Sequence, residues 1–172
     1  MTEKFIPYSR QSIDQSDIDA VVEVLKTDWM TQGPKIAEFE NELANRVESK
    51  YAVAVATGTA ALHCACFAAG LKPGDEIITS PITFAASGNC ALYLGATVKF
   101  IDIRKDTYCM DYEKLESAIT KKTKAIIPVD YTGQPCDMDE INSIAKKNNI
   151  TVIEDAAHAL GAKYKKKSIG SL

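Results

Sequence analysis

The stretch Thr151-Val152-Ile153-Glu154-Asp155-Ala156-Ala157-His158-Ala159-Leu160-Gly161 decides the fold of this 172-residue chain. Its first three residues are apolar or β-branched and follow a helix-like segment, which predicts a buried parallel strand over 151–153. Glu154 and Asp155 follow at the carboxyl end of that strand, where open α/β sheets bind ligands. A carboxylate there is costly to desolvate unless a cation meets it, and a protonated pyridine nitrogen is such a cation. Asp155 is therefore predicted either to face the ring of a pyridoxal phosphate cofactor or to cap the next loop or helix.

Strand and helix patterns alternate before this stretch. Strands are predicted at residues 52–56, 76–79, 97–103 and 124–129, and helices at residues 60–69, 85–94, 111–119 and 138–148. Short connections join these segments. The alternation predicts an α/β fold with three layers, in which a mostly parallel sheet is covered by helices on both faces.

The region before residue 51 shows no strand pattern. Two amphipathic helices are expected there, the first after a capping box at residues 12–15 and the second after the break at Gly33-Pro34. The predicted domains are therefore an N-terminal helical arm over residues 1–50 and an α/β domain over residues 51–172.

Composition narrows the possible partners. Twenty Lys and Arg residues against twenty-three Asp and Glu give a net charge of −3, with no basic block for a phosphate backbone, so nucleic acid is not an expected partner. The densest positive run, residues 163–167, is typical of a solvated hairpin or loop. No apolar stretch has transmembrane length and no signal sequence follows Met1, so no membrane association and a cytoplasmic location are expected.

The five cysteines are odd in number and scattered. Cys64 and Cys66 lie two apart on a predicted helix, so they point to different faces, and only His63 and His158 are available as histidine ligands. No metal site is expected. The cysteines are interpreted as reduced, small hydrophobic residues.

Three further segments place polar or aromatic residues at predicted strand ends. The run Thr57-Gly58-Thr59-Ala60-Ala61 leads from a strand into a helix, where free N–H groups and the helix dipole suit a phosphate; an ordinary strand–helix turn is the alternative. Phe84 either stacks on a planar ring or anchors the next helix in the core. Residues 130–135 either form the floor of a pocket or only turn the chain.

Four blocks of this sequence carry a family resemblance. They are Gly58-Thr59-Ala60-Ala61-Leu62-His63, Gly74-Asp75-Glu76-Ile77-Ile78-Thr79-Ser80-Pro81, Lys122-Thr123-Lys124-Ala125-Ile126-Ile127-Pro128-Val129 and Ile153-Glu154-Asp155-Ala156-Ala157-His158. In this order they resemble the DegT/StrS-type sugar-nucleotide aminotransferases, enzymes of the fold-type I pyridoxal-phosphate superfamily. The resemblance implies pyridoxal 5′-phosphate as cofactor and an incomplete fold-type I large domain from residue 51 onward.

Two other runs point to one branch of that family. Leu25-Lys26-Thr27-Asp28-Trp29-Met30-Thr31-Gln32-Gly33 and Ser80-Pro81-Ile82-Thr83-Phe84-Ala85-Ala86-Ser87 most resemble the pseudaminic-acid-pathway UDP-4-amino-4,6-dideoxy-N-acetyl-altrosamine transaminases. The resemblance implies transfer of an amino group from glutamate to a UDP-linked 4-keto-6-deoxy-N-acetylhexosamine.

The resemblance also implies residue roles. Thr59 and Ala60 match the positions whose backbone amides hold the cofactor phosphate. Phe84 matches the aromatic residue that stacks on the cofactor ring. Asp155 matches the partner of the ring nitrogen, and His158 matches a group near the phenolic oxygen. From the residues alone, His158 is equally a satisfied polar group at a strand end. The implied substrate contacts are Tyr8, Asp28, Trp29, Met30, Thr31 and Thr57.

One family feature is not found in this sequence. The Schiff-base lysine of the family would come shortly after Leu172, and Lys163, Lys165, Lys166 and Lys167 do not fit its motif. The C-terminal domain is also expected to be missing, so the isolated chain is expected to be inactive. A full-length parent is expected to be a homodimer.

Two rival hypotheses remain open. One is a sugar dehydratase of the same superfamily, which has His at the position of the lysine. The other is a non-catalytic module that binds the cofactor or a sugar nucleotide. A Rossmann oxidoreductase is the weakest candidate, because no dinucleotide glycine pattern follows the first strand.

Overall fold

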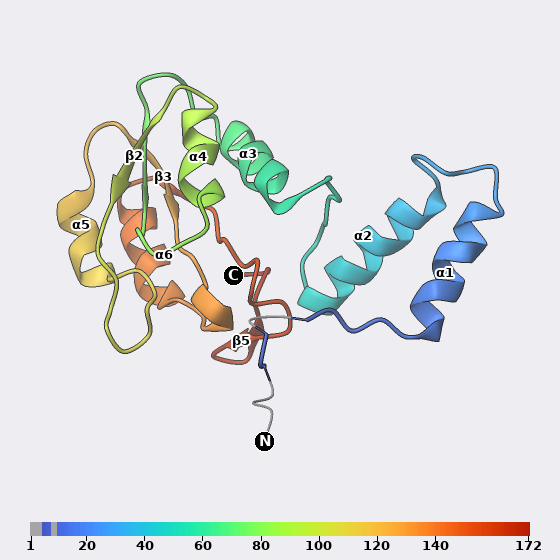
Figure 1. Cartoon of the computed structure of the whole chain (residues 1–172). Coiled ribbons are helices and arrows are strands. Elements are labelled where there is room, and N and C mark those ends of the chain that lie inside the picture. Colours follow the sequence, from blue (N-terminus) through green and yellow to red (C-terminus); the bar gives the residue numbers. More distant parts are fainter. Residues whose placement is uncertain (1–4, 8–9) are drawn as a thin grey trace. The chain divides into compact units, whose positions relative to one another are not determined.

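A computed structural model describes residues 5–7 and 10–172 of the chain (Figure 1). The chain forms two compact units, the first ending at Phe39 and the second running from Glu40 to Leu172. The division falls inside helix α2, Pro34–Val47.

The first unit contains helix α1, Gln15–Leu25. Its N-cap is Asp14, whose side chain accepts hydrogen bonds from the N–H groups of Ser16 and Asp17, while the Asp17 carboxylate accepts from the N–H of Asp14 at 2.9 Å. The predicted capping box at residues 12–15 is therefore wrong by two positions. An Asp pair satisfies the same free N–H groups and adds negative charge at the positive end of the helix dipole.

The second unit is built on a parallel sheet of four strands. They are β1, Glu76–Thr79; β2, Thr97–Phe100; β3, Thr123–Ile127; and β4, Thr151–Val152. Their order is β2-β1-β3-β4, and every neighbouring pair is parallel. The predicted parallel sheet is confirmed.

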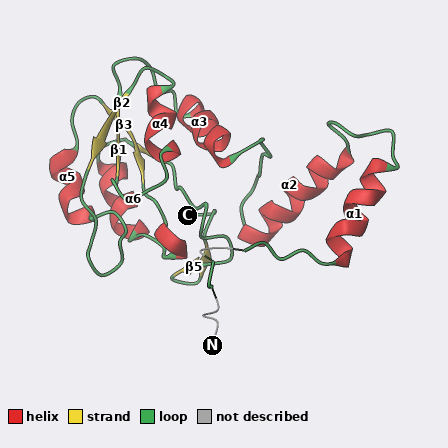
Figure 2. Cartoon of the chain, in the orientation of Figure 1, coloured by secondary structure: helices red, strands yellow, loops and turns green. Residues whose placement is uncertain are grey.

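Helices cover both faces of this sheet (Figure 2). Alternate residues of the strands belong to two separate cores: Ile77 and Ile127 pack with helices α3, Gly58–Ala68, and α4, Ala86–Leu92. Ile78 and Ile126 pack with α5, Leu115–Ala118, and α6, Met138–Lys147. The period of two along each strand thus produces the three predicted layers.

The structure differs from the prediction at one helix and one strand. The helix expected at residues 111–119 is a 3-10 turn, Tyr112–Lys114, followed by α5. The strand expected at residues 52–56 is not formed: the segment has no partner in the sheet, and Val53 and Val55 are exposed. A strand needs a neighbour for its hydrogen bonds, and here the N–H of Ala54 donates instead to the Glu40 carboxylate at 2.8 Å.

The lysine-rich run forms the predicted hairpin. Strands β5, Lys163–Tyr164, and β6, Lys167–Ser168, pair antiparallel, and Lys165 and Lys166 turn the chain with positive φ angles. Cysteines follow their predicted packing except at Cys64, which is exposed; the other four are buried. Within the described residues, no helix has the length and apolar composition that crossing a bilayer requires.

Strand β3 offers a direct test of this core. Ile126 is fully buried, whereas Lys124, two residues earlier in the same strand, is exposed. We expect Ile126→Ala to lower the free energy of unfolding by about 2–5 kcal/mol, because it leaves a cavity. Lys124→Ala should change it by no more than about 0.5 kcal/mol. Urea denaturation of the two variants measures the difference, and equal effects would contradict the burial assigned to Ile126 in this core.

Candidate functional site

The site lies where strands β3 and β4 end. Beyond β4, the N–H of Asp155 donates to the carbonyl of Pro128 at 2.9 Å, and the N–H of Asp130 donates to the carbonyl of Asp155 at 3.1 Å. A parallel bridge between Val129 and Asp155 thus extends the sheet past its last regular pair. These bonds hold Asp155 at the carboxyl edge of the sheet, as its position after the strand predicts.

Asp155 is a buried carboxylate, 9% exposed, that points toward α4. Its Oδ2 accepts a hydrogen bond of 2.6 Å from the hydroxyl of Ser87, which is itself fully buried. Its Oδ1 accepts from the N–H of Ala157 at 3.4 Å. The alternative role predicted for Asp155, a cap on the next loop or helix, is therefore present only as the long hydrogen bond from Ala157. The short hydrogen bond comes from Ser87 on α4.

Phe84 lies in the loop between β1 and α4. Its side chain is 76% exposed, so it is not the core anchor that was one of its two predicted roles. The Phe84 carbonyl lies 3.1 Å from the Ser87 hydroxyl, and the Ser87 hydroxyl lies 2.6 Å from that of Thr83. The backbone of Phe84 therefore lies next to the Ser87 hydroxyl, which donates to Asp155.

The N-terminus of α3 is capped by Thr57. The Thr57 hydroxyl accepts from the N–H of Ala60 at 3.1 Å, so one of the two amides predicted for a phosphate already has an internal partner. Thr59 follows in the first turn, where α-helices leave N–H groups without intrahelical partners. Helices α3 and α4 pack on the same face of the sheet through the core that contains Leu62, Cys66 and Cys90.

His158 lies three residues beyond Asp155, and its side chain is exposed. Its carbonyl contacts the turn at residues 130–135: a Cβ added to Gly133 would lie 3.0 Å from the His158 oxygen. Thr132 and Gly133 both have positive φ angles in this turn, which favours glycine at the second position. The turn therefore packs against the backbone that follows Asp155.

Two other carboxylates point to the opposite face. Asp130 and Glu154 alternate with Val129 and Asp155 along their strands, so they lie on the α6 side. Asp130 accepts from the N–H of Cys136 at 2.9 Å, and Glu154 accepts from the N–H of Gly170 at 3.3 Å. The remaining oxygen of each is buried without a partner among the described residues.

Burial and mutual repulsion determine the charge of this pair. Burial and, to a smaller extent, the neighbouring Asp130 carboxylate raise the pKa of Glu154 to about 7. Burial also raises the pKa of Asp130. Because two neighbouring like charges resist ionising together, Glu154 keeps its proton at pH values between 4.5 and about 7, where an ordinary glutamate has lost it.

The predicted substrate residues lie elsewhere in the chain. Asp28, Trp29, Met30 and Thr31 belong to the first unit, in the connection between α1 and α2, and all four are exposed. Tyr8 lies outside the described residues. Thr57 belongs to the second unit and caps α3.

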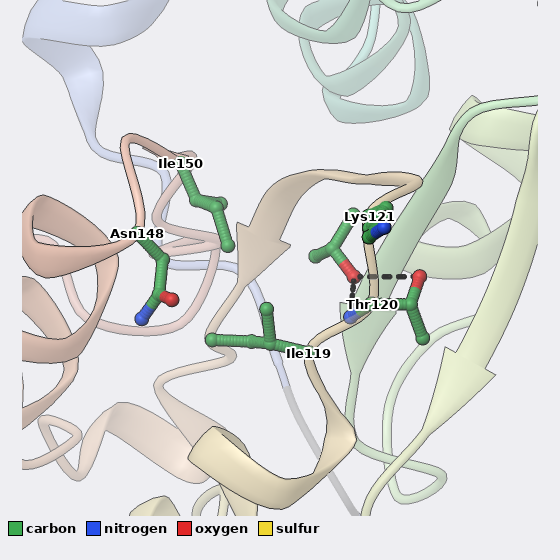
Figure 3. Close-up of a pocket in the computed structure, with 6 residues that line it drawn as sticks. Ile119, Thr120, Lys121, Asn148 and Ile150 are labelled. Atoms are coloured by element: carbon green, nitrogen blue, oxygen red, sulfur yellow. Dashed lines mark hydrogen bonds between the residues drawn. The ribbon is translucent and has the colours of Figure 1, made fainter.

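A separate hollow of about 510 Å³ lies at the other edge of the sheet (Figure 3). It is lined by Ile119, Thr120, Lys121, Thr123, Asn148 and Ile150. These residues precede or begin strands β3 and β4, so the hollow is at their amino ends. None of the predicted site residues lines it.

Comparison with known proteins identifies the family. Residues 11–172 match the DegT/DnrJ/EryC1/StrS aminotransferase family. The chain belongs to this family. The predicted family resemblance is thereby confirmed, while its pseudaminic-acid branch remains a prediction.

Individual proteins resemble this chain in sequence and in structure. The chain is 49% identical over 170 residues to the uncharacterized protein MJ1066 of Methanocaldococcus jannaschii, covering 99% of this chain and 44% of that protein. It is 47% identical over 168 residues to the spore coat polysaccharide biosynthesis protein SpsC of Bacillus subtilis, covering 98% and 43%. The structure matches the PMP form of Spr1654 from Streptococcus pneumoniae, assigned as a sugar aminotransferase, with a TM-score of 0.93, 37% identity and coverage of 96% and 46%. The chain spans less than half the length of these relatives.

The site contains residues that the sequence analysis assigned no role. Ser87 and Thr83 are four residues apart at a predicted helix start, and small hydroxyl residues in an otherwise apolar segment were the available signal. Asp130 was predicted only as part of residues 130–135, which were expected to form the floor of a pocket or to turn the chain. Its backbone hydrogen bond to Asp155, beyond the end of β4, depends on which strands pair, and this pairing cannot be read from the sequence.

The Asp130–Glu154 pair predicts an unusual dependence of stability on pH. Glu154 has an ordinary pKa of 4.5 and a folded pKa of about 7, so the folded chain keeps a proton that the unfolded chain has lost between these values. The free energy of unfolding therefore falls as pH rises through this window. Because Glu154 is only partly buried, we expect a loss of about 1–2 kcal/mol, measured by urea denaturation at each pH.

Glu154→Gln removes the titrating proton and keeps the shape of the side chain, so its stability should vary less over the same window. Glu42→Gln, at an exposed position, should retain the wild-type profile. A Glu154→Gln profile that matches the wild type would show that the proton resides elsewhere.

Proposed function

We propose that this protein is the amino-terminal part of a pyridoxal-phosphate-dependent aminotransferase that acts on a sugar nucleotide. Its buried Asp155 carboxylate carries the proposal. Among the described residues, no lysine or arginine forms an ion pair with Asp155, whose hydrogen bonds come from Ser87 and Ala157. A buried carboxylate without a cation is costly, and a protonated pyridine nitrogen would compensate it.

Other residues of the second unit fit the remaining parts of the same cofactor. Phe84 offers an exposed ring near the Asp155 side of the sheet, suited to stacking on a planar heterocycle. The first turn of α3, with Thr59 and Ala60, would hold the phosphate; Ala60 would share its N–H between phosphate and Thr57. Spr1654, the structural relative, has been solved in both PLP and PMP forms.

The roles of the residues follow from their chemistry. When bound, the cofactor supplies an electron sink for the carbon that loses its proton. Asp155 would keep the ring nitrogen protonated by remaining ionised, and Phe84 would fix the plane of the ring. His158 would lie beside the phenolic oxygen, where an imidazole N–H or a bridging water can donate a hydrogen bond.

The proposed substrates are glutamate as amino donor and a UDP-linked 4-keto-6-deoxy-N-acetylhexosamine as acceptor. The pseudaminic-acid-branch motifs at residues 25–33 and 80–87 support this acceptor. Tyr8, Asp28, Trp29, Met30, Thr31 and Thr57 are the proposed contacts. Exposed aromatic and polar side chains at residues 28–31 suit a sugar nucleotide.

The proposed activity belongs to a longer parent protein, with residues 1–50 as a helical arm, residues 51–172 as part of the cofactor-binding domain, and a homodimeric, cytoplasmic assembly. Lys163, Lys165, Lys166 and Lys167 lie on the β5–β6 hairpin, and Lys165 is paired with Asp139 at 2.7 Å. None of these lysines is proposed to bond to the cofactor.

Cofactor binding tests the role of Asp155. Pyridoxamine 5′-phosphate is the preferred probe, because its amine does not condense with surface lysines. We expect the 172-residue chain to bind it, and Asp155→Ala to weaken binding by about 10- to 100-fold through loss of a charged partner. Isothermal titration calorimetry measures both. Asp139→Ala, at an exposed carboxylate, is the control, and unchanged affinity in Asp155→Ala would refute the proposed function.

Activity of the isolated chain is a separate test. Without a lysine placed to move the substrate proton, the 172-residue chain is expected to show no transfer of the amino group from glutamate to the keto-sugar nucleotide. Measuring 2-oxoglutarate release detects turnover. Turnover that disappears on Lys163→Ala or Lys166→Ala would assign the missing role to the hairpin instead.

A further inference from the structure

The Ser87 hydroxyl lies at the centre of a group of oxygen atoms. Its Oγ is 2.6 Å from Thr83 Oγ1, 3.1 Å from the carbonyl oxygen of Phe84 and 2.6 Å from Asp155 Oδ2. Ser87 is fully buried in the first turn of α4, so water does not compete for these contacts.

The direction of these bonds follows from counting protons. An ionised carboxylate and a carbonyl only accept, and Ser87 has a single hydroxyl proton to give. The shorter contact takes that proton to Asp155. Thr83 therefore donates to Ser87, and the chain of donors runs from Thr83 through Ser87 to Asp155.

This chain has an electrostatic consequence for Asp155. Burial favours the neutral form of a carboxyl group, and beside a pyridinium it favours transfer of the ring proton to the carboxylate. A short hydrogen bond donated to the carboxylate opposes that transfer, because it stabilises the ionised form. Donation from Thr83 polarises the Ser87 hydroxyl and strengthens the effect.

The same hydroxyl also relates two parts of the proposed site. Phe84 precedes α4 and Asp155 follows β4, and Ser87 Oγ lies close to the backbone of the first and the side chain of the second. It thereby links the loop that presents the aromatic ring to the carboxylate at the strand end.

We propose that Ser87 is a positioning residue that keeps Asp155 ionised and oriented toward the ring nitrogen of the cofactor, with Thr83 as its own donor. This inference rests on the proposed function. It assigns the control of ring protonation to a hydroxyl on α4.

A double-mutant cycle with pyridoxamine 5′-phosphate tests the inference. Ser87→Ala should weaken binding to the 172-residue chain by about 3- to 10-fold. In the Asp155→Ala background the same change should alter affinity by less than about twofold, because Ser87 would act only through that carboxylate. Ser87→Cys, with a weaker donor of similar size, should give an intermediate loss.

A spectroscopic measurement separates positioning from general loosening. With pyridoxamine 5′-phosphate labelled with ¹⁵N in the ring, the bound signal should lie at the protonated position in the wild type. In Ser87→Ala it should move toward the unprotonated position, because Asp155 then competes better for the proton. Ser80→Ala removes another buried hydroxyl, one without a partner among the described residues, and should leave signal and affinity unchanged.

The outcomes distinguish this inference from the proposed function. If Asp155→Ala leaves binding unchanged, the proposed function itself fails. If Asp155→Ala weakens binding but Ser87→Ala does not, or weakens it equally in both backgrounds, Ser87 has no positioning role. An unmoved ¹⁵N signal in both Ser87 variants, or an equal effect of Ser80→Ala, also overturns it; unfolding midpoints confirm that each variant is folded.

Discussion

The hydrogen bond from Ser87 to Asp155 is the interaction on which the candidate site depends. It joins two residues 68 positions apart and connects the first turn of α4 with the end of β4. Because Asp155 is also fixed by backbone bonds to Pro128 and Asp130, its carboxylate is held from the strand side and from the helix side. A side chain restrained in this way loses little conformational entropy when a charged ligand binds.

The pleat of the sheet separates this carboxylate from two others. Asp155 faces α4, whereas Glu154 and Asp130 face α6, so one strand end serves two different environments. On the α4 side, a donor stabilises the ionised form. On the α6 side, burial raises the pKa of Glu154 to about 7. The period of two that builds the layers therefore also places the acidic residues in two different environments.

Local patterns predicted the elements well and the contacts between them less well. The strand at 76–79 and the helix start near Met138 follow from apolar periodicity, and the buried strand after residue 150 follows from its β-branched run. The strand at 52–56 failed because strand formation depends on a neighbour, which the segment lacks in this structure. Asp155 was predicted as a site residue because its position after a buried strand shows, from the sequence alone, that its carboxylate would be costly to desolvate. Ser87 was not assigned a role, because a serine becomes a donor to a particular carboxylate only after the sheet and α4 have packed.

The proton on Glu154 also bears on Asp155. If Asp130, Glu154 and Asp155 were all ionised, three negative charges would share two adjacent strand ends, and each would raise the cost of the others. Asp155 adds to the repulsion at Asp130 even across the sheet. Retaining a proton on the α6 side lowers the negative charge at these strand ends. The two faces of the strand end are thus electrostatically coupled, because the Asp155 carboxylate on the α4 side helps to raise the pKa of Asp130 on the α6 side.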